Sequence, residues 1–319
     1  MKYYEKLLAL GCVTRSQLEQ VTGSPSAADW LCREYQRKGY MERIKRNLYA
    51  VISLETGQCV ANRYQIASHI SDDAVVSYHS AFEYYGYANQ VFYEVQVTSV
   101  SRFRAFNYDG ITYRHIGQRI EDGVLELSNG IRVTSLERTV IDSINLFEKT
   151  GGLEELLRCL ALIPTLDEKG LIACLSEYDS GILYQKAGYV LSHFAEAMGL
   201  SQSFFESCAA HIPKGKNYFY DYGQDFVWHE KWKLYTKLAV EEFQDDTGIV
   251  DSDDTNYGKV NDATWGKMAE VLYVPSSGNP TLFRMNGRTA ITAKYSGGVY
   301  NFYYHNTDGT EGSKFASVY

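Results

Sequence analysis

The spacing of helix-capping residues in the first forty positions constrains the fold more than any other feature of this chain. Thr14 stands three residues before Gln17, which is the arrangement of a capping box at a helix start. Ser24 directly precedes Pro25, and proline is favoured at the first position of a helix. Apolar residues recur at helical spacing around these signals. We therefore predict three short helices, one over residues 2–10 and two that begin at the caps.

An extended segment follows the third helix. Residues 40–45 and 48–52 are strand-like, and Arg46-Asn47 between them has the composition of a turn. Three short helices followed by a β-hairpin is the element order of a winged helix-turn-helix. In that fold the third helix enters the major groove of DNA and the hairpin, or wing, lies along the backbone.

Positive charge is concentrated in this part of an acidic chain. The formal net charge is −8, yet residues 1–52 carry nine Lys and Arg against five Asp and Glu, a local excess of +4. Cations on the third helix and wing would neutralise phosphates and release counterions. The predicted DNA-binding residues are Arg15, Ser26, Arg33, Arg37, Lys38, Arg43, Lys45 and Arg46. Base edges would be contacted from the start of the third helix, by Ser26, Ala27, Asp29 and Trp30. The alternative is a solvated basic face on a domain that binds protein.

Several segments of the chain resemble one protein family. YEKLLALGCVTRSQLEQVTG and RKGYMERIKRNLYAVI resemble the N-terminal winged helix of AbiEi-family proteins. The similarity continues through DDAVVSYHSAFEYYG, IRVTSLERTVIDSI and AGYVLSHFAEAMGL, so that it spans about residues 1–215. The stretch VTSLERTVID is its most specific part.

This resemblance implies a function. AbiEi proteins are antitoxins and transcriptional regulators of bacterial abortive-infection systems, which are type IV toxin–antitoxin systems. Their N-terminal domain binds promoter DNA and represses the operon. Their second domain is associated with neutralising a nucleotidyltransferase-like toxin encoded next door, without a stable complex between the two proteins.

Residues 56–215 are predicted to form an α+β domain in which strands come first and helices later. Asn129-Gly130 lies between two extended runs and indicates a hairpin. Thr134 or Ser135 is expected to cap the helix that follows. Further strands are expected at residues 91–99 and 110–116. Residues 60–84 have a helical pattern, with residues 78–85 as another helix, and further helices are expected at residues 153–163 and 188–200.

No pattern of catalytic residues stands out. His79 and Ser80 are adjacent, but neighbours on a helix point about 100° apart and do not form a nucleophile–base pair. Arg138 and Asp142 have the spacing of an ion pair on a helix. The sequence contains no GxSxG, P-loop, HExxH or GxGxxG motif. We therefore predict neither an enzyme nor a bound cofactor or metal.

The cysteines and the apolar segments indicate where in the cell the protein is expected. The six cysteines show no CxxC spacing, which favours reduced thiols in a cytoplasmic protein over a zinc site. No apolar run reaches the roughly 20 residues of a membrane span.

The last hundred residues are acidic and then β-like. Residues 241–270 contain nine acidic residues and two lysines. Residues 241–262 are expected to form a solvated linker. The alternatives are an acidic surface that mimics nucleic acid or binds a basic partner, and a calcium loop. The calcium loop would use Asp251, Asp253, Asn256 and Asp262, where Asn replaces the usual Gly and Asp the usual Glu.

Two further expectations concern this region. Residues 226–243 are expected to form a helix, or a strand and a helix. Turns at Asn286-Gly287, Gly297-Gly298 and Asp308-Gly309 predict an antiparallel meander.

The sequence thus predicts an α+β protein with three parts: a winged helix-turn-helix (residues 1–55), an AbiEi-like domain (56–215) and an acidic linker with a β-rich module (216–319). The expected function is that of a promoter-binding autorepressor and antitoxin, bound as two copies to an inverted repeat. The alternative is an interaction protein of phage defence or counter-defence, which inhibits another protein through its C-terminal module.

Overall fold

The computed structural model describes residues 3–128, 130–219 and 226–236, together with the backbone of five strands between residues 269 and 318. The chain forms two compact units, residues 1–237 and residues 238–319. The fold is α+β, as predicted.

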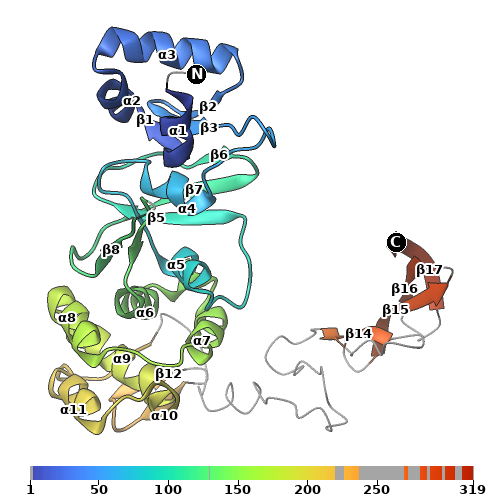
Figure 1. Cartoon of the computed structure of the whole chain (residues 1–319). Coiled ribbons are helices and arrows are strands. Elements are labelled where there is room, and N and C mark those ends of the chain that lie inside the picture. The colour runs from blue at the N-terminus through green and yellow to red at the C-terminus, as the bar shows by residue number, and fades with distance from the viewer. Residues whose placement is uncertain are drawn as a thin grey trace. The chain divides into compact units, whose positions relative to one another are not determined.

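The first unit begins with a winged helix-turn-helix (Figure 1). Its three strands pair antiparallel in the order β1-β3-β2, so β2 and β3 form the predicted wing. The short strand β1 was not predicted, because three residues carry too little pattern to be recognised. The elements are α1 (Tyr4–Leu10), β1 (Cys12–Thr14), α2 (Arg15–Thr22), α3 (Pro25–Arg37), β2 (Met41–Lys45) and β3 (Leu48–Val51).

The capping signals act as the sequence indicates. The Thr14 hydroxyl accepts a hydrogen bond from the Gln17 N–H, and the Gln17 side chain accepts one from the Thr14 N–H. Ser24 caps α3 by accepting from the Ala27 N–H, and Pro25 occupies its first turn. These bonds satisfy N–H groups that a helix start leaves unpaired. The buried face of α3 is made of Ala28, Leu31, Cys32 and Tyr35.

A six-stranded sheet follows the winged helix, in the order β6-β7-β5-β4-β9-β8. It is mixed, since β5 pairs with β7 and β4 with β9 in parallel while the other neighbours are antiparallel. The predicted hairpin is confirmed by the pairing of β8 with β9, although Asn129 itself lies outside the described residues. The elements of this part are α4 (Arg63–Ser68), β4 (Val75–Val76), α5 (Tyr78–Tyr85), β5 (Glu94–Ser99), β6 (Phe106–Tyr108), β7 (Ile111–Gly117), β8 (Val124–Glu126) and β9 (Arg132–Thr134).

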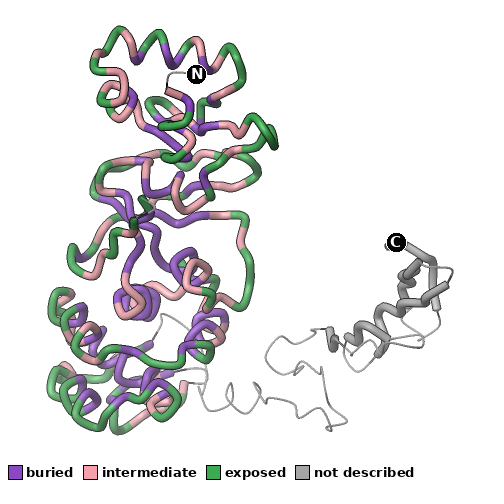
Figure 2. The backbone as a smooth tube through the Cα atoms, in the orientation of Figure 1, coloured by how far each residue is buried: buried purple, intermediate pink, exposed green. Residues whose placement is uncertain are grey.

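Helices occupy the far side of this sheet from the winged helix (Figure 1). Ser135 caps α6, as one of the two predicted cap residues, and Val140, Ile141 and Ile144 of this helix are fully buried. Figure 2 shows α6 as an almost wholly buried helix between the sheet and the outer helices. The elements are α6 (Leu136–Asn145), the 3-10 turn η1 (Phe147–Thr150), α7 (Leu153–Ala161), α8 (Glu168–Tyr178), α9 (Gly181–Ser192), α10 (Ala195–Met198) and α11 (Gln202–Ala210).

The winged helix and the central sheet share a hydrophobic cluster. Cys12, Leu48 and Ala50 of the winged helix pack in one core with residues of α4 and the central strands, such as Ala67 and Val97. The other face of the winged helix has a core of its own, centred on Leu7, Leu18 and Leu31. Because the wing sheet is buried on both faces in this way, the winged helix is held firmly on the central sheet.

A small sheet closes the first unit against α9. It pairs β10 (Asn217–Tyr218), β12 (Leu234–Thr236) and β11 (Val227–His229) in that order. The Gln185 side chain of α9 donates to the carbonyls of Trp232 and Lys233 at 2.6 and 2.7 Å. The first unit therefore continues to residue 237, past the domain end at residue 215 that the sequence suggests. Within the segment 226–243, which was expected to contain a helix, the described residues form the strands β11 and β12 joined by a turn, and residues 237–243 lie outside the described residues.

The second unit contains a five-stranded sheet in the order β13-β14-β15-β16-β17. Every neighbouring pair is antiparallel and consecutive in sequence, which confirms the predicted meander. The predicted turn residues and the acidic stretch 241–262 lie outside the described residues. The strands are β13 (Ala269–Val271), β14 (Thr281–Met285), β15 (Arg288–Ser296), β16 (Val299–His305) and β17 (Glu311–Val318).

In the part of the chain that the structure describes, no helix has the length and apolar character that crossing a membrane requires.

Candidate nucleic-acid interface

Helix α3 lies along the outer edge of the winged helix, on the side away from the central sheet (Figure 1). Its solvent face carries Ser26, Trp30, Arg33 and Arg37, all exposed. These residues are spaced four, three and four apart, so they line one stripe of the helix. The structure thus brings together three of the predicted DNA-binding residues on a free helix face.

Arg15 has a different role in the geometry. Its guanidinium bonds the Asp29 carboxylate at 2.8 Å, the Pro25 carbonyl at 2.9 Å and the Glu19 carboxylate at 2.8 Å. Asp29 and Pro25 belong to α3, so Arg15 joins the start of α2 to the first turn of α3. A guanidinium with three internal partners serves first to set the angle between the two helices.

Two further cations are paired at the end of α3. Arg37 and Lys38 both bond the Glu34 carboxylate, at 2.8 and 2.9 Å. The hydrogen bonds from Arg37 and Lys38 lower the pKa of Glu34 to about 2. The three residues therefore carry a net charge of about +1 at neutral pH. All are at the surface, where such pairs exchange readily with phosphate partners.

The three cations of the wing differ in their exposure to solvent. Arg43 and Arg46 are exposed, and no carboxylate of the described residues pairs with Arg46. Lys45 lies instead against the central domain, with its ammonium 5.1 Å from the ring centre of Phe103 and 5.4 Å from that of Phe106. Burial lowers the pKa of Lys45. Of the wing cations, Arg46 is the best placed to meet a phosphate.

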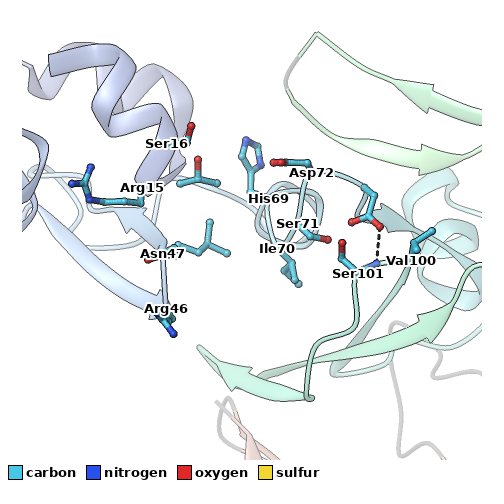
Figure 3. A pocket seen from close by; sticks show the side chains of 13 residues that line it. Arg15, Ser16, Arg46, Asn47, His69, Ile70, Ser71, Asp72, Val100 and Ser101 are labelled. Carbon is cyan, nitrogen blue, oxygen red and sulfur yellow. Dashed lines mark hydrogen bonds between the residues drawn. The ribbon is translucent and has the colours of Figure 1, made fainter. Parts of the chain in front are cut away.

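A cavity of about 680 Å³ lies between the winged helix and the central domain, beside the wing tip (Figure 3). Arg15 and Arg46 lie on its winged-helix side, and Asp72, Ser71 and Ser101 lie on its central-domain side. Residues of both charge signs therefore line the same cavity. The Asp73 carboxylate accepts a hydrogen bond from the Ser101 N–H at 2.7 Å, which ties together two loops of the wall.

Among the described residues, one group of side chains has the donor types of a metal site, and it lies in the central domain. His79, Glu155 and Cys159 are buried, and their donor atoms lie within 4.8 Å of one another. Yet Glu155 already accepts hydrogen bonds from His79 Nε2 at 3.1 Å and from the N–H groups of Asn89 and Gln90 at 3.1 and 2.9 Å.

Burial raises the pKa of the Cys159 thiol, which disfavours the thiolate that a metal needs. Burial alone would also raise the pKa of Glu155, but the bonds from His79, Gln90 and Asn89 outweigh it and lower that pKa. These contacts indicate a structural role, because they hold together α5, α7 and the loop between α5 and β5.

Ser80 does not act with His79. The Ser80 hydroxyl accepts from the Gln96 N–H at 3.0 Å and lies 3.4 Å from the Glu94 carbonyl, so it secures α5 to β5. Ser80 therefore lies inside α5, whose N-cap position is Ser77.

The Arg138–Asp142 pair is present and almost fully buried, at 3.3 Å. Arg138 also donates to the carbonyls of residues 120, 121 and 122. The Tyr178 hydroxyl donates to the other Asp142 oxygen at 2.5 Å. The pair thus fixes the loop before β8 onto α6 and α8, which is a positioning role.

These features place a basic, exposed helix face and wing at one end of the first unit. Comparison with protein families identifies this part. Residues 5–52 match the AbiEi family described as "Transcriptional regulator, AbiEi antitoxin". The predicted resemblance is confirmed for the AbiEi winged helix. Over residues 53–215 it stays a prediction. The family description names a regulator and an antitoxin, and neither term denotes an enzyme.

The fold of this chain has a counterpart among solved structures. The crystal structure of the RV2827C protein from Mycobacterium tuberculosis matches with a TM-score of 0.51 and 18% sequence identity, over 73% of this chain and 88% of that one. At this identity the likeness shows a shared fold alone. No curated protein matches the chain.

Sequence reasoning missed three features of the site: the bracing role of Arg15, the aromatic contacts of Lys45 and the His79–Glu155 bond. Each joins residues distant in sequence, such as Lys45 and Phe103. A periodic pattern cannot report such contacts. The one available signal was the aromatic composition of the segment that begins at residue 101.

Proposed function

We propose that this protein binds the promoter of its own operon through the winged helix and represses transcription, as the antitoxin of a type IV toxin–antitoxin system. The observation that carries the proposal is the free face of α3, with exposed Arg33 and Arg37, on a domain that matches regulators of the AbiEi family. Such a face fits the major groove, and the wing would follow the backbone.

Charge supports DNA as the partner. The excess of +4 over residues 1–52 favours a polyanion in a chain whose total charge is −8. Arg46 and Arg43 on the wing would take phosphates, as would Arg37 and Lys38 once they exchange Glu34 for DNA. Arg15 would act by setting the position of α3.

The test is binding of the full chain to its own promoter fragment across a salt series, with unrelated DNA as competitor. Arg33→Ala/Arg46→Ala removes one cation from α3 and one from the wing. Lys169→Ala, an exposed lysine of α8, is the matched control. Specific binding that the double variant loses and the control keeps supports the proposal. Binding no tighter than to competitor DNA would sink it.

The antitoxin role concerns a nucleotidyltransferase-like toxin encoded beside this gene. Co-expression of the full chain with that toxin is expected to restore the growth of cells that the toxin inhibits. The variant Arg33→Ala/Arg46→Ala, which should not bind DNA, is expected to restore growth as well if the rest of the protein neutralises the toxin. Absence of rescue by the wild-type chain would refute an antitoxin role.

A second candidate function rests on the separate C-terminal unit. Residues 238–319 form a compact unit with a five-stranded meander. A small β-module next to an acidic stretch suits a protein partner with a basic surface. If this unit inhibits another protein, deletion of residues 238–319 will abolish protection while promoter binding survives. Full protection without these residues would rule the candidate out.

A further inference from the structure

The solvent face of α3 carries one large apolar side chain that packing does not explain. Trp30 is 59% exposed, although the opposite face of the same helix is buried. Among the described residues, none of the ring–ring or cation–ring contacts involves its indole. Tryptophan is also a poorer helix former than alanine. Tryptophan is enriched at interfaces, and this exposed indole shares its helix face with the predicted DNA-binding residues Ser26 and Arg33, so a contact with a partner is its expected role.

The surroundings of Trp30 define the chemistry of that partner. Ser26 lies one turn before it and Arg33 one turn after it on the same face. The Arg33 side chain bonds the Asp29 carbonyl through Nε at 3.3 Å, which leaves both terminal nitrogens for another group. The neighbouring Asp29 carboxylate is occupied by Arg15 at 2.8 Å. The indole therefore shares its helix face with a guanidinium whose two terminal nitrogens have no partner among the described residues, a charge arrangement that suits DNA.

In the major groove, the apolar group on the edge of a base pair is the C5-methyl of thymine. Trp30 is the sixth of the 13 residues of α3, in the N-terminal half of the helix, and the N-terminal residues of a recognition helix are those that contact base edges. We propose that Trp30 packs on a thymine methyl group of the operator and so determines sequence preference, with Arg33 taking a neighbouring guanine. This inference rests on the proposed promoter binding and adds the base that is recognised.

The experiment replaces thymines of the promoter fragment one at a time with deoxyuridine, which removes only the methyl group. Affinities of the full-length wild-type chain and of Trp30→Ala are measured for each fragment. Tyr93→Ala, which truncates another exposed aromatic residue, is the matched control. Because a buried methyl group contributes about 0.8 kcal/mol, wild-type affinity should fall about fourfold at the recognised thymine.

The decisive comparison is between the two proteins. Trp30→Ala should bind the unmodified promoter more weakly than wild type and should lose nothing further at that thymine. The inference is overturned if no deoxyuridine weakens wild-type binding, if the loss is equal in Trp30→Ala, or if Trp30→Ala binds as wild type does. Absence of specific promoter binding by the wild-type chain would instead refute the proposed function. Circular dichroism checks that the variant is folded.

Discussion

Lys45 and Arg46 are neighbours on the wing, and their surroundings predict opposite effects when each is replaced. Arg46 is exposed and has no carboxylate partner among the described residues, whereas the Lys45 ammonium contacts the rings of Phe103 and Phe106. Arg46→Ala should therefore weaken DNA binding. Lys45→Met, which keeps the aliphatic stem, should instead weaken the attachment of the wing to the central domain.

The magnitudes follow from the two kinds of contact. Loss of one phosphate contact makes the negative slope of log K against log salt shallower by about 0.9. The ratio of the wild-type affinity to that of Arg46→Ala should therefore fall about 3.5-fold between 50 and 200 mM salt. Loss of the cation–π contacts of Lys45 costs about 1 kcal/mol. For a unit of this size that lowers Tm by about 2–4 °C.

Both quantities can be measured on the same samples. Fluorescence anisotropy with the promoter fragment across a salt series gives the slope, and thermal unfolding followed by circular dichroism gives Tm. We expect Arg46→Ala to change the slope alone and Lys45→Met to change Tm alone. A slope change in Lys45→Met as large as that in Arg46→Ala would show that Lys45 contacts a phosphate and that our interpretation of the wing is wrong.

Three predictions concern the interior of the first unit. The lowered pKa of Glu155 gives stability that is complete above its unfolded pKa of about 4.3 and is lost as pH falls through the folded pKa. In Glu155→Gln, the free energy of unfolding from urea titrations should fall less at acid pH than in wild type. The same pH dependence in both proteins would contradict this prediction. Gly188→Ala would place a methyl group 2.1 Å from the Trp232 ring, so Tm should fall by the equivalent of about 1–3 kcal/mol. Gly117→Ala, with nothing within 4 Å, is its control, and equal effects would refute the reasoning. Arg138→Met leaves the Asp142 charge buried, which should cost about 3–5 kcal/mol in chemical unfolding, and a loss under 1 kcal/mol would refute it.

The amino-acid sequence alone was sufficient for the local features of this protein. The capping box of Thr14 and Gln17, the Ser24-Pro25 helix start and the i, i+4 pair of Arg138 and Asp142 all depend on residues a few positions apart. Hydrogen bonds and side-chain periodicity over such distances are set by the backbone geometry of a single element. The winged helix could therefore be predicted element by element, apart from the three-residue strand β1.

Tertiary structure decided which of the basic residues are held by contacts within the protein and which can meet a partner. The sequence groups Arg15, Lys45 and Arg46 as equal cations, but Arg15 is held by α3 and Lys45 by two phenylalanines of the central domain. The continuation of the first unit to residue 237 likewise depends on contacts between Gly188 and Trp232. Such contacts join residues from 14 to more than 50 positions apart, and their partners are chosen by packing in three dimensions, which no local pattern encodes.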